Sequence, residues 1–320
     1  MNTLKQPIIF LLGPTASGKT EWAIHWQKTF DAIEIISVDS VMIYKECNIG
    51  SAKPSNDVLQ SHPHHLVNHV SLNCIFSVAD FYESAIKLIE DIHSREKIPL
   101  LVGGSMMYFN VLKHGISSLP SADPAFRKTL EEKILKGGIE NLYKDLARLD
   151  PEAAKSIQPN DSQRIIRALE IININKKSVG ASIADSNSVA LQEKYDLIEY
   201  GIFPAQRIEL HKRIEARQDK LVGNKLIEEI LQIKDIFNIS SSHPAMKAIN
   251  YRQGLQVING QLKKSELFEK SLFATRQLAK RQCTWMRGWE NLTCFDLFNL
   301  ELATELSLIH ISEPTRPLII

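Results

Sequence analysis

The glycine-rich segment near the start of the chain has the residue types and spacing of a phosphate-binding loop. It reads GPTASGKT, which fits the pattern GxxxxGK[ST], and it lies between an apolar run and a helical pattern. Glycines let backbone N–H groups turn toward an anion, the Lys19 ammonium adds positive charge, and the Thr20 hydroxyl can hold Mg²⁺. The pattern predicts a bound di- or triphosphate, with Gly13, Pro14, Thr15, Ala16, Ser17, Gly18, Lys19 and Thr20 as the binding residues.

A single carboxylate stands where an acceptor substrate would lose a proton. Asp39 directly follows the apolar run Ile33–Val38, whereas the run Ile98–Val102, where an NTPase would carry its Walker-B aspartate, ends in two glycines. In small P-loop kinases, an acidic residue after the second strand meets the acceptor. The position therefore favours Asp39 as a general base. Its alternative role is that of a helix or turn cap.

Two arginines farther along the chain have the spacing of an anion clamp. Arg213 and Arg217 lie four positions apart in a helical pattern, so they share one helix face. Two guanidinium groups on one face can hold the oxygens of a diphosphate. The alternative is a solvated face, because Glu209 and Glu215 lie beside them.

A second group of basic residues lies in a strongly helical segment near the end of the chain. Arg276, Lys280 and Arg287 recur at positions that share one helix face. Basic groups interleaved with aromatic rings suit phosphate contact and base stacking, although such a stripe alone could equally be a solvated helix flank. The nearby residues that would share the role are Arg281, Trp285 and Trp289.

These residues require a scaffold that brings strand ends and helix starts together. Short apolar runs alternate with helical patterns, which indicates a parallel sheet with helices on both faces. A predicted capping box, Ser77 with Asp80, starts a helix that reaches about Ile92. The fold class is α/β, a P-loop NTPase-like parallel sheet flanked by helices. We expect strands at Pro7–Leu12, Ile33–Val38, His65–Val70, Ile98–Val102, Leu197–Phe203 and Leu292–Phe295.

A mostly helical insertion domain interrupts this core. Residues 124–175 carry helical patterns without a clear strand, and Asn175–Ser188 is polar enough to be a loop. We therefore expect the α/β core with its C-terminal helices over 1–119 and 197–300, and the insertion over 120–196. Leu306–Arg316 resembles the translation of a sequencing adapter, so 306–320 is expected to be an artefactual tail in place of a native C-terminus.

The composition is that of a globular protein. The chain has 320 residues, 44% of them hydrophobic, and a formal net charge of +1, so any affinity for nucleic acid must come from a local basic patch. No apolar run is long enough to span a membrane, and the N-terminus lacks a signal-peptide pattern, which predicts a cytoplasmic protein. Scattered cysteines without a CxxC pair fit a reducing compartment. The spacing of four neighbouring histidines fits no common zinc site, so core and turn roles are expected for His62, His64, His65 and His69.

Further motifs occur in order between residues 8 and 290. They are Ile36–Ser40 with Ile43–Lys45, Asn48–Gly50 with Ala52–Pro54, Pro63–Leu66, Gly103–Ser105 with Tyr108, Leu119–Pro124, Asn160–Asp161 with Gln163–Arg164 and Arg167–Glu170, and Ala274–Gln282 with Thr284, Trp285 and Arg287. Together with the phosphate-binding loop, they resemble the tRNA dimethylallyltransferase family. The family's eukaryotic zinc-finger extension is missing, which suggests the bacterial type.

The resemblance implies a reaction. In this family the P-loop holds the diphosphate of dimethylallyl diphosphate rather than ATP, and the prenyl group goes to N6 of adenosine 37, next to the anticodon of tRNA. Thr15 and Lys19 would then act at the reaction centre, Asp39 would be the general base, Arg213 and Arg217 would clamp the diphosphate, and Mg²⁺ would bind at Thr20. The implied partners are the anticodon stem-loop and the prenyl donor, with a monomer as the acting form and no membrane.

The resemblance also implies which residues meet tRNA, including several in the insertion. Two depart from the family pattern: Asn250 replaces a glycine, although asparagine tolerates left-handed backbone well, and Ser105 replaces threonine but keeps the hydroxyl. The residues are Asp39, Ser40, Val41, Met42, Ser105, Arg127, Gln163, Arg164, Ile165, Ile166, Arg167, Lys247, Asn250, Tyr251, Arg252, Arg276, Lys280, Arg281, Gln282, Trp285 and Arg287.

Two other functions fit parts of the pattern. A small-molecule or nucleoside kinase would use the same P-loop to transfer phosphate from ATP. An RNA-binding P-loop switch would show nucleotide-dependent RNA affinity without a covalent product. The absence of a Walker-B aspartate and the position of Asp39 both favour the prenyltransferase.

Overall fold

The computed structural model describes residues 5–116, 119–120, 123–184, 190–301 and 303–305. The chain divides into two compact units, residues 1–113 with 191–320 and residues 114–190. The insertion expected at 120–196 can be compared with the second of these units. The expected artefactual tail, 306–320, lies outside the described residues.

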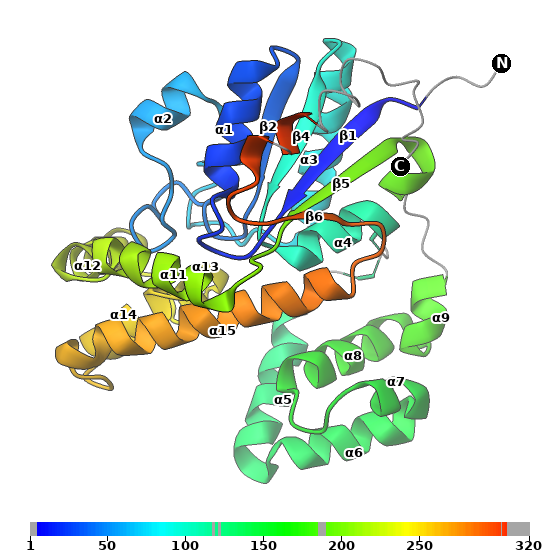
Figure 1. Cartoon of the computed structure of the whole chain (residues 1–320). Coiled ribbons are helices and arrows are strands. Elements are labelled where there is room, and N and C mark those ends of the chain that lie inside the picture. Colours follow the sequence, from blue (N-terminus) through cyan, green and yellow to red (C-terminus); the bar gives the residue numbers. More distant parts are fainter. Residues whose placement is uncertain (1–4, 117–118, 121–122, 185–189, 302, 306–320) are drawn as a thin grey trace. The chain divides into compact units, whose positions relative to one another are not determined.

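The larger unit is built on a six-stranded parallel sheet with the order β3-β2-β4-β1-β5-β6 (Figure 1). This confirms the predicted α/β class. The strands are β1 (Pro7–Leu12), β2 (Ile33–Val38), β3 (His64–His65), β4 (Ile98–Gly103), β5 (Asp196–Ile202) and β6 (Thr293–Phe295).

The third strand is much shorter than the sequence suggested. A strand over His65–Val70 was expected, but β3 ends at His65. Leu66 and Asn68 both have positive φ, 63° and 55°, and this left-handed backbone turns the chain out of the sheet. The apolar residues after β3 therefore pack from a turn and not from a strand.

The strand register brings the ends of the three central strands level. Gly103 at the end of β4 pairs with Leu12 on one side and with Val38 on the other. The segments that follow β1, β2 and β4 therefore leave the sheet at the same edge, as expected for ligand-binding loops of a parallel α/β sheet. The register explains why the loop after Leu12, the carboxylate after Val38 and Gly104 lie together.

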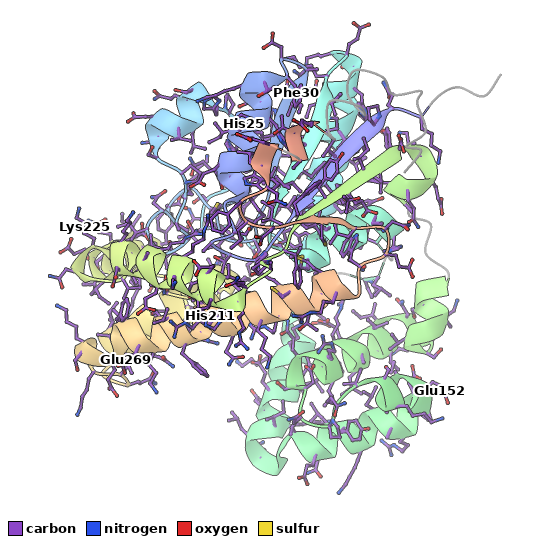
Figure 2. The ribbon with its side chains drawn as sticks, in the orientation of Figure 1. His25, Phe30, Glu152, His211, Lys225 and Glu269 are labelled. Atoms are coloured by element: carbon purple, nitrogen blue, oxygen red, sulfur yellow. The ribbon has the colours of Figure 1, made fainter. Side chains whose placement is uncertain are left out.

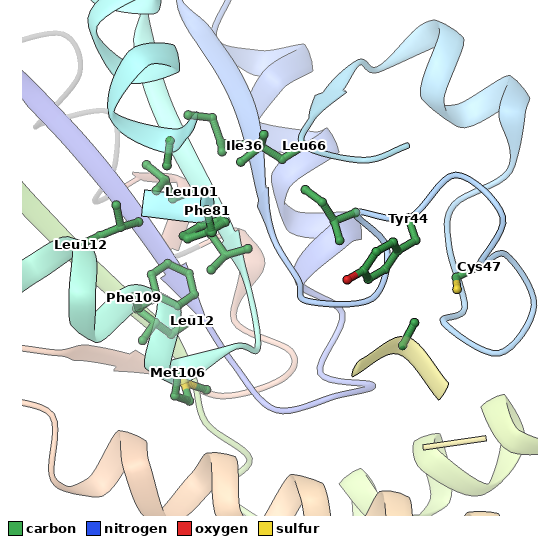
Figure 3. Packing of buried hydrophobic residues seen from close by; sticks show 14 of the residues in the cluster. Leu12, Ile36, Tyr44, Cys47, Leu66, Phe81, Leu101, Met106, Phe109 and Leu112 are labelled. Carbon is green, nitrogen blue, oxygen red and sulfur yellow. The ribbon is translucent and has the colours of Figure 1, made fainter. Parts of the chain in front are cut away.

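Successive β1 side chains point into two different hydrophobic clusters. Ile8, Phe10 and Leu12 belong to the cluster that includes α3 (Val78–Ser94) and α4 (Met106–His114), and Figure 3 shows part of it. The rings of Phe10 and Phe109 are 5.0 Å apart there. Ile9 and Leu11 belong to the cluster that includes Trp22 and Trp26 of α1 (Lys19–Thr29). Burial on both faces is why β1 reads as a continuous apolar run.

A group of helices follows β5. In Figure 2 the labelled side chains His211, Lys225 and Glu269 mark the first two of these helices and the last. Besides these helices and the three already described (α1, α3 and α4), the larger unit contains α2 (Asn56–Ser61) and α10 (Leu191–Lys194). The helices after β5 are α11 (Arg207–Leu221), α12 (Asn224–Phe237), α13 (Pro244–Lys247), α14 (Tyr251–Ile258), the 3-10 turn η1 (Lys264–Glu266) and α15 (Leu267–Arg287).

The smaller unit is helical and has its own core. Two of its longer helices begin at a capping aspartate: Asp123 accepts the Phe126 N–H at 3.0 Å, and Asp161 accepts the Arg164 N–H at 3.1 Å. Leu142, Leu146 and Ile165 are among its buried core residues. The helices are α5 (Pro124–Gly137), α6 (Ile139–Leu149), α7 (Pro151–Ser156), α8 (Ser162–Asn175) and α9 (Val179–Ala184).

Candidate active site

The loop between β1 and α1, residues 13–18, has the backbone conformation of an anion cradle. Ala16 and Gly18 have φ of 63° and 91°, and these left-handed residues wind the loop into the helix. Gly18 is the N-cap of α1 and offers no capping side chain, so the first amides of the helix are left for a ligand. The strand–loop–helix context predicted for this motif is confirmed.

The ammonium of Lys19 folds back over this loop. Nζ donates to the Pro14 carbonyl at 2.6 Å and to the Ser17 hydroxyl at 3.4 Å. Burial, and after it the positive charge of Arg217, lowers the pKa of Lys19 to about 7, and the carboxylate of Asp39 opposes this shift. An anion bound in the loop would favour the charged form and raise this pKa.

Helix α11 brings two arginines to the loop. Arg217 Nη1 lies 3.5 Å from the Thr15 hydroxyl oxygen. A nitrogen of the Arg213 guanidinium lies 3.3 Å from the position that a Cβ on Gly18 would occupy. The guanidinium of Arg213 also lies over the ring of Phe298, at 5.1 Å from its centre. The two arginines therefore flank the anion cradle, and neither belongs to a merely solvated helix face.

Asp39 has the cap role that the sequence left open, and its geometry leaves room for the other, that of a general base. Its Oδ1 accepts the N–H groups of Val41 at 2.8 Å and Met42 at 3.0 Å, which is a turn-capping geometry. Its Oδ2 makes no hydrogen bond to any residue that the structure describes, and Asp39 lines the cavity beside the loop. One oxygen thus holds the carboxylate in place and leaves the other for a substrate.

The anion cradle and Asp39 lie in one cavity of about 1190 Å³. Other lining residues come from the ends of β2 and β4, from residues 50–54 and from α1, α2, α4, α11, α13, α14 and α15. Because the whole chain carries a net charge of only +1, the charge here is concentrated locally. The lining has seven basic side chains, Lys19, Arg213, Arg217, Lys220, Lys247, Arg252 and Arg281, and two acidic ones, Glu21 and Asp39.

Comparison with known proteins identifies the family. A family model described as IPP transferase matches residues 42–289, which is more than half of the chain. The chain belongs to the IPP transferase family. The matched range begins after the anion cradle, so the cradle and the family match are independent observations.

Named relatives of this IPP transferase cover nearly its whole length. A tRNA dimethylallyltransferase from Nitrosomonas eutropha is 41% identical over 93% of each chain. One from Legionella pneumophila (strain Corby) is 42% identical over 93% of this chain and 94% of the relative. A solved tRNA isopentenylpyrophosphate transferase from Bacillus halodurans has a TM-score of 0.69 at 32% identity, over 97% of this chain and 98% of the other. A eukaryotic dimethylallyltransferase described as acting on tRNA shares the fold, with a TM-score of 0.79 at 24% identity, over 98% of this chain and 81% of the other.

About half of the residues expected to meet tRNA line the cavity of this IPP transferase. Two aromatic side chains, Tyr108 and Trp285, also line it, and Trp285 is 44% exposed. The expected residues found there are Asp39, Ser40, Val41, Met42, Ser105, Lys247, Asn250, Arg252, Arg281, Gln282 and Trp285.

The expectation for Tyr251 was wrong. It was expected to contact tRNA, but its side chain is 0% exposed and its hydroxyl donates to Glu229 Oε1 at 2.7 Å. The ring packs so tightly on Gly50 that a Cβ there would lie 2.6 Å from it. Tyr251 therefore shapes the cavity wall from behind and cannot touch RNA in this structure.

Sequence reasoning missed Glu229. Its carboxylate accepts the backbone N–H groups of Asn48, Ile49 and Gly50 at 3.1, 2.7 and 3.1 Å. It thereby fixes the loop that leads into the cavity wall. A glutamate within the apolar stripe of α12 was the available signal, because a carboxylate buried at such a position needs partners.

Asn250 confirms the expectation that asparagine can replace the glycine of the family pattern. Its φ is 74°, and its side chain makes two buried hydrogen bonds. It donates to the Gly50 carbonyl at 2.9 Å and accepts from Gln218 at 2.8 Å. The asparagine therefore adds contacts that a glycine could not make.

The basic stripe of α15 does not line the cavity. The residues of α15 that do are Thr275, Leu278, Arg281, Gln282 and Trp285, on the opposite face of the helix. In the stripe, Arg276 is paired with Glu215 of α11 at 2.8 Å, Lys280 is exposed, and Arg287 lies over the ring of Phe203.

The tRNA-contact residues expected in the insertion fall into three groups. Ile165 is 0% exposed in the core of the smaller unit, so the expectation for its side chain was wrong. Arg127 and Arg167 both bond to the fully buried Glu170 and so have a structural role. The remaining expected residues are Gln163 and Arg164, which are exposed, and Ile166, which is half-buried against that core.

Metal ligands are sparse in the described part of the chain. No group of three or more His, Cys, Asp or Glu side chains there could hold a metal ion. The histidine cluster has turn and packing roles, as expected: His64 bonds to the His62 carbonyl and His65 bonds to Glu34. Thr20, which lines the cavity, fits Mg²⁺ because that ion takes few protein ligands beside phosphate oxygens. No helix in the described residues is long and apolar enough to cross a membrane.

Proposed function

We propose that this IPP transferase transfers a dimethylallyl group from dimethylallyl diphosphate to N6 of adenosine 37, next to the anticodon of tRNA, and releases diphosphate. One observation carries the proposal: a single cationic cavity contains both an anion cradle and a carboxylate oxygen of Asp39 left open for a substrate. The names of the relatives support the same reaction.

The donor's diphosphate fits the start of α1, with Lys19, Arg213 and Arg217 around it. An allylic C–O bond breaks with cationic character on carbon, so groups that stabilise the departing diphosphate lower the barrier. When bound, Mg²⁺ held by the Thr20 hydroxyl would neutralise part of the charge on that leaving group. The chain supplies the fixed amides and cations, and they need no rearrangement during the reaction.

The acceptor nitrogen loses a proton as its new bond to carbon forms. Adenine N6 is a poor nucleophile because its lone pair is delocalised into the ring. In the proposed step, the N6–carbon bond forms, the C–O electron pair leaves with diphosphate, and Asp39 Oδ2 takes the N6 proton. General-base catalysis of this kind contributes about 10²- to 10⁴-fold. The Oδ1 bonds to Val41 and Met42 hold the carboxylate in position for it.

The acceptor base must leave its stack to enter the cavity. A single-stranded anticodon loop allows this at low energetic cost. Trp285 and Tyr108 offer rings for stacking, and Lys247, Arg252 and Arg281 offer charge for the phosphates. Every group invoked comes from one chain, so the proposal takes a monomer as the acting form, in the cytoplasm where tRNA is found.

Nucleoside mass spectrometry tests the proposal. An anticodon stem-loop is incubated with the full chain, Mg²⁺ and either dimethylallyl diphosphate or ATP, then digested. The expected product is an adenosine heavier by C5H8, formed only with the prenyl donor. Phosphate transfer from ATP would indicate a kinase, and nucleotide-dependent RNA binding without any covalent product would indicate a switch. Either result overturns the proposal.

A further inference from the structure

The side chain of Gln282 bridges the anion cradle and the end of a central strand. Its Oε1 accepts the Thr15 backbone N–H at 2.9 Å, and its Nε2 donates to the Gly104 carbonyl at 2.8 Å. In sequence, Gln282 is 267 residues from Thr15 and 178 from Gly104. The residue is 6% exposed, so both bonds are shielded from water.

The surrounding backbone is shaped to admit this amide. A Cβ on Gly104 would lie 2.4 Å from Gln282 Nε2, so a larger residue there would push the side chain away. A Cβ on Gly103 would lie 2.0 Å from the Val38 carbonyl oxygen, which keeps the end of β4 close to β2. The two glycines that replace a Walker-B aspartate thus make room for a glutamine from α15.

The bond to Thr15 determines which groups of the cradle face a ligand. Because its N–H points to Gln282, the Thr15 amide is removed from the set of amides that can bind diphosphate. The Thr15 hydroxyl remains beside Arg217 Nη1 at 3.5 Å. Gln282 therefore fixes the orientation of the loop residue whose hydroxyl meets the α11 clamp.

We infer that Gln282 is a positioning residue for the donor site and not a tRNA contact, an inference that rests on the proposed function. All three of Arg281, Gln282 and Trp285 line the cavity, but both ends of the Gln282 amide are already bonded to protein, whereas Arg281 and Trp285 are exposed. Helix α15 thus holds the donor cradle with one side chain and presents two others to the acceptor. A shift of α15 when RNA binds would therefore move the backbone amide of Thr15, through its hydrogen bond to Gln282.

Binding of inorganic diphosphate to the full chain tests the inference without requiring turnover. Gln282→Leu keeps the volume and removes both hydrogen bonds. We expect diphosphate binding, measured by calorimetry, to weaken about tenfold, and the affinity for the anticodon stem-loop without donor to change less than twofold. The matched control is Gln277→Leu, at a half-exposed position of α15 whose side chain has no hydrogen bond to the described residues. It should alter neither affinity.

A second variant separates positioning from general destabilisation. The protonated carboxyl of Gln282→Glu can accept from Thr15 and donate to Gly104, whereas its carboxylate can only accept and would repel the Gly104 carbonyl. We expect the diphosphate affinity of this variant, relative to wild type, to recover as the pH falls from 8 toward about 5. The same ratio for Gln282→Leu should stay flat, because division by wild type removes the titration of Lys19.

The outcomes are distinguishable from those of the proposed function. If wild type binds no diphosphate, the proposed function fails first. If wild type binds diphosphate, the positioning role is wrong in either of two cases. In the first, Gln282→Leu and Gln282→Glu bind diphosphate as tightly as wild type. In the second, the main loss in these variants is in the affinity for the stem-loop. A recovery at low pH in the glutamate variant alone supports it.

Discussion

The guanidinium of Arg217 lies 3.5 Å from the hydroxyl of Thr15, although 202 residues separate them in the sequence. This contact joins α11 to the loop after β1. Burial lowers the pKa of Arg217 and the carboxylate of Asp39 opposes the shift, but a guanidinium begins so high that it stays charged. The proposed donor site is therefore assembled from segments that only the folded chain brings together.

Replacing Arg217 by glutamine should weaken the donor site. A hydrogen bond from a charged donor is lost, so we expect kcat/KM for the prenyl donor to fall about 10- to 100-fold at saturating tRNA. Arg207→Gln is the matched control, because Arg207 is exposed on the same helix and does not line the cavity. An equal loss in both variants would show that the effect is general to α11.

Replacing Asp39 by asparagine should separate chemistry from binding. The asparagine oxygen can still accept the Val41 and Met42 N–H groups, so the turn survives, but no carboxylate is left to take a proton. Single-turnover rates at saturating donor should fall about 10²- to 10⁴-fold, with diphosphate affinity reduced far less. Near wild-type single-turnover rates would remove Asp39 from the reaction. Asp39→Ala, which also loses the turn, should show the same loss of rate with weaker stem-loop binding.

The titration of Lys19 should appear in the pH dependence of donor binding. Its pKa is about 7, and the ammonium that attracts diphosphate is present below that value and lost above it. The diphosphate affinity of wild type, relative to Lys19→Arg, should therefore decline as pH rises through 7, approaching about tenfold per pH unit. Calorimetry in buffers of different ionisation enthalpy should show proton uptake on binding at pH 8. A ratio independent of pH would mean that Lys19 is already charged.

Removing the hydroxyl of Tyr251 should reduce stability and leave RNA binding intact. Tyr251→Phe deletes the 2.7 Å bond to Glu229 in a fully buried position. We expect the free energy of unfolding, from urea denaturation, to fall by about 1 to 3 kcal/mol. Stem-loop affinity should stay within twofold when measured well below the unfolding transition. A large loss of affinity in the folded variant would restore Tyr251 to the RNA contacts.

The fold was largely predictable because its signals are local. Continuous apolar runs marked β1, β2 and β4 within one residue of their observed bounds, and the Ser77–Asp80 capping box started α3 where expected. The failure at β3 has a local cause that the sequence hides. Leu66 has a φ of 63°, a backbone that leucine seldom adopts, and its side chain is buried in the core.

The site was less predictable because side-chain direction depends on tertiary packing. Periodicity placed Arg276, Lys280 and Arg287 on one face of a helix, but it could not show that α11 covers part of that face. Likewise, the motif that contains both residues could not show that Tyr251 is buried while Arg252 lines the cavity. The motif residues predicted the cradle itself. The roles of Glu229 and Gln282 could not be predicted in this way, because they depend on partners far away in the chain.

The central position of β1 in the sheet determines which strands can unfold locally without it. β1 has two strands on one side and three on the other, whereas β3 and β6 each have a single neighbour and only two or three residues. Fraying at either border can therefore occur while the strand that carries the cradle stays paired. Amide hydrogens of Ile9 to Leu11 should exchange with solvent only when the whole unit unfolds, and those of β6 much sooner.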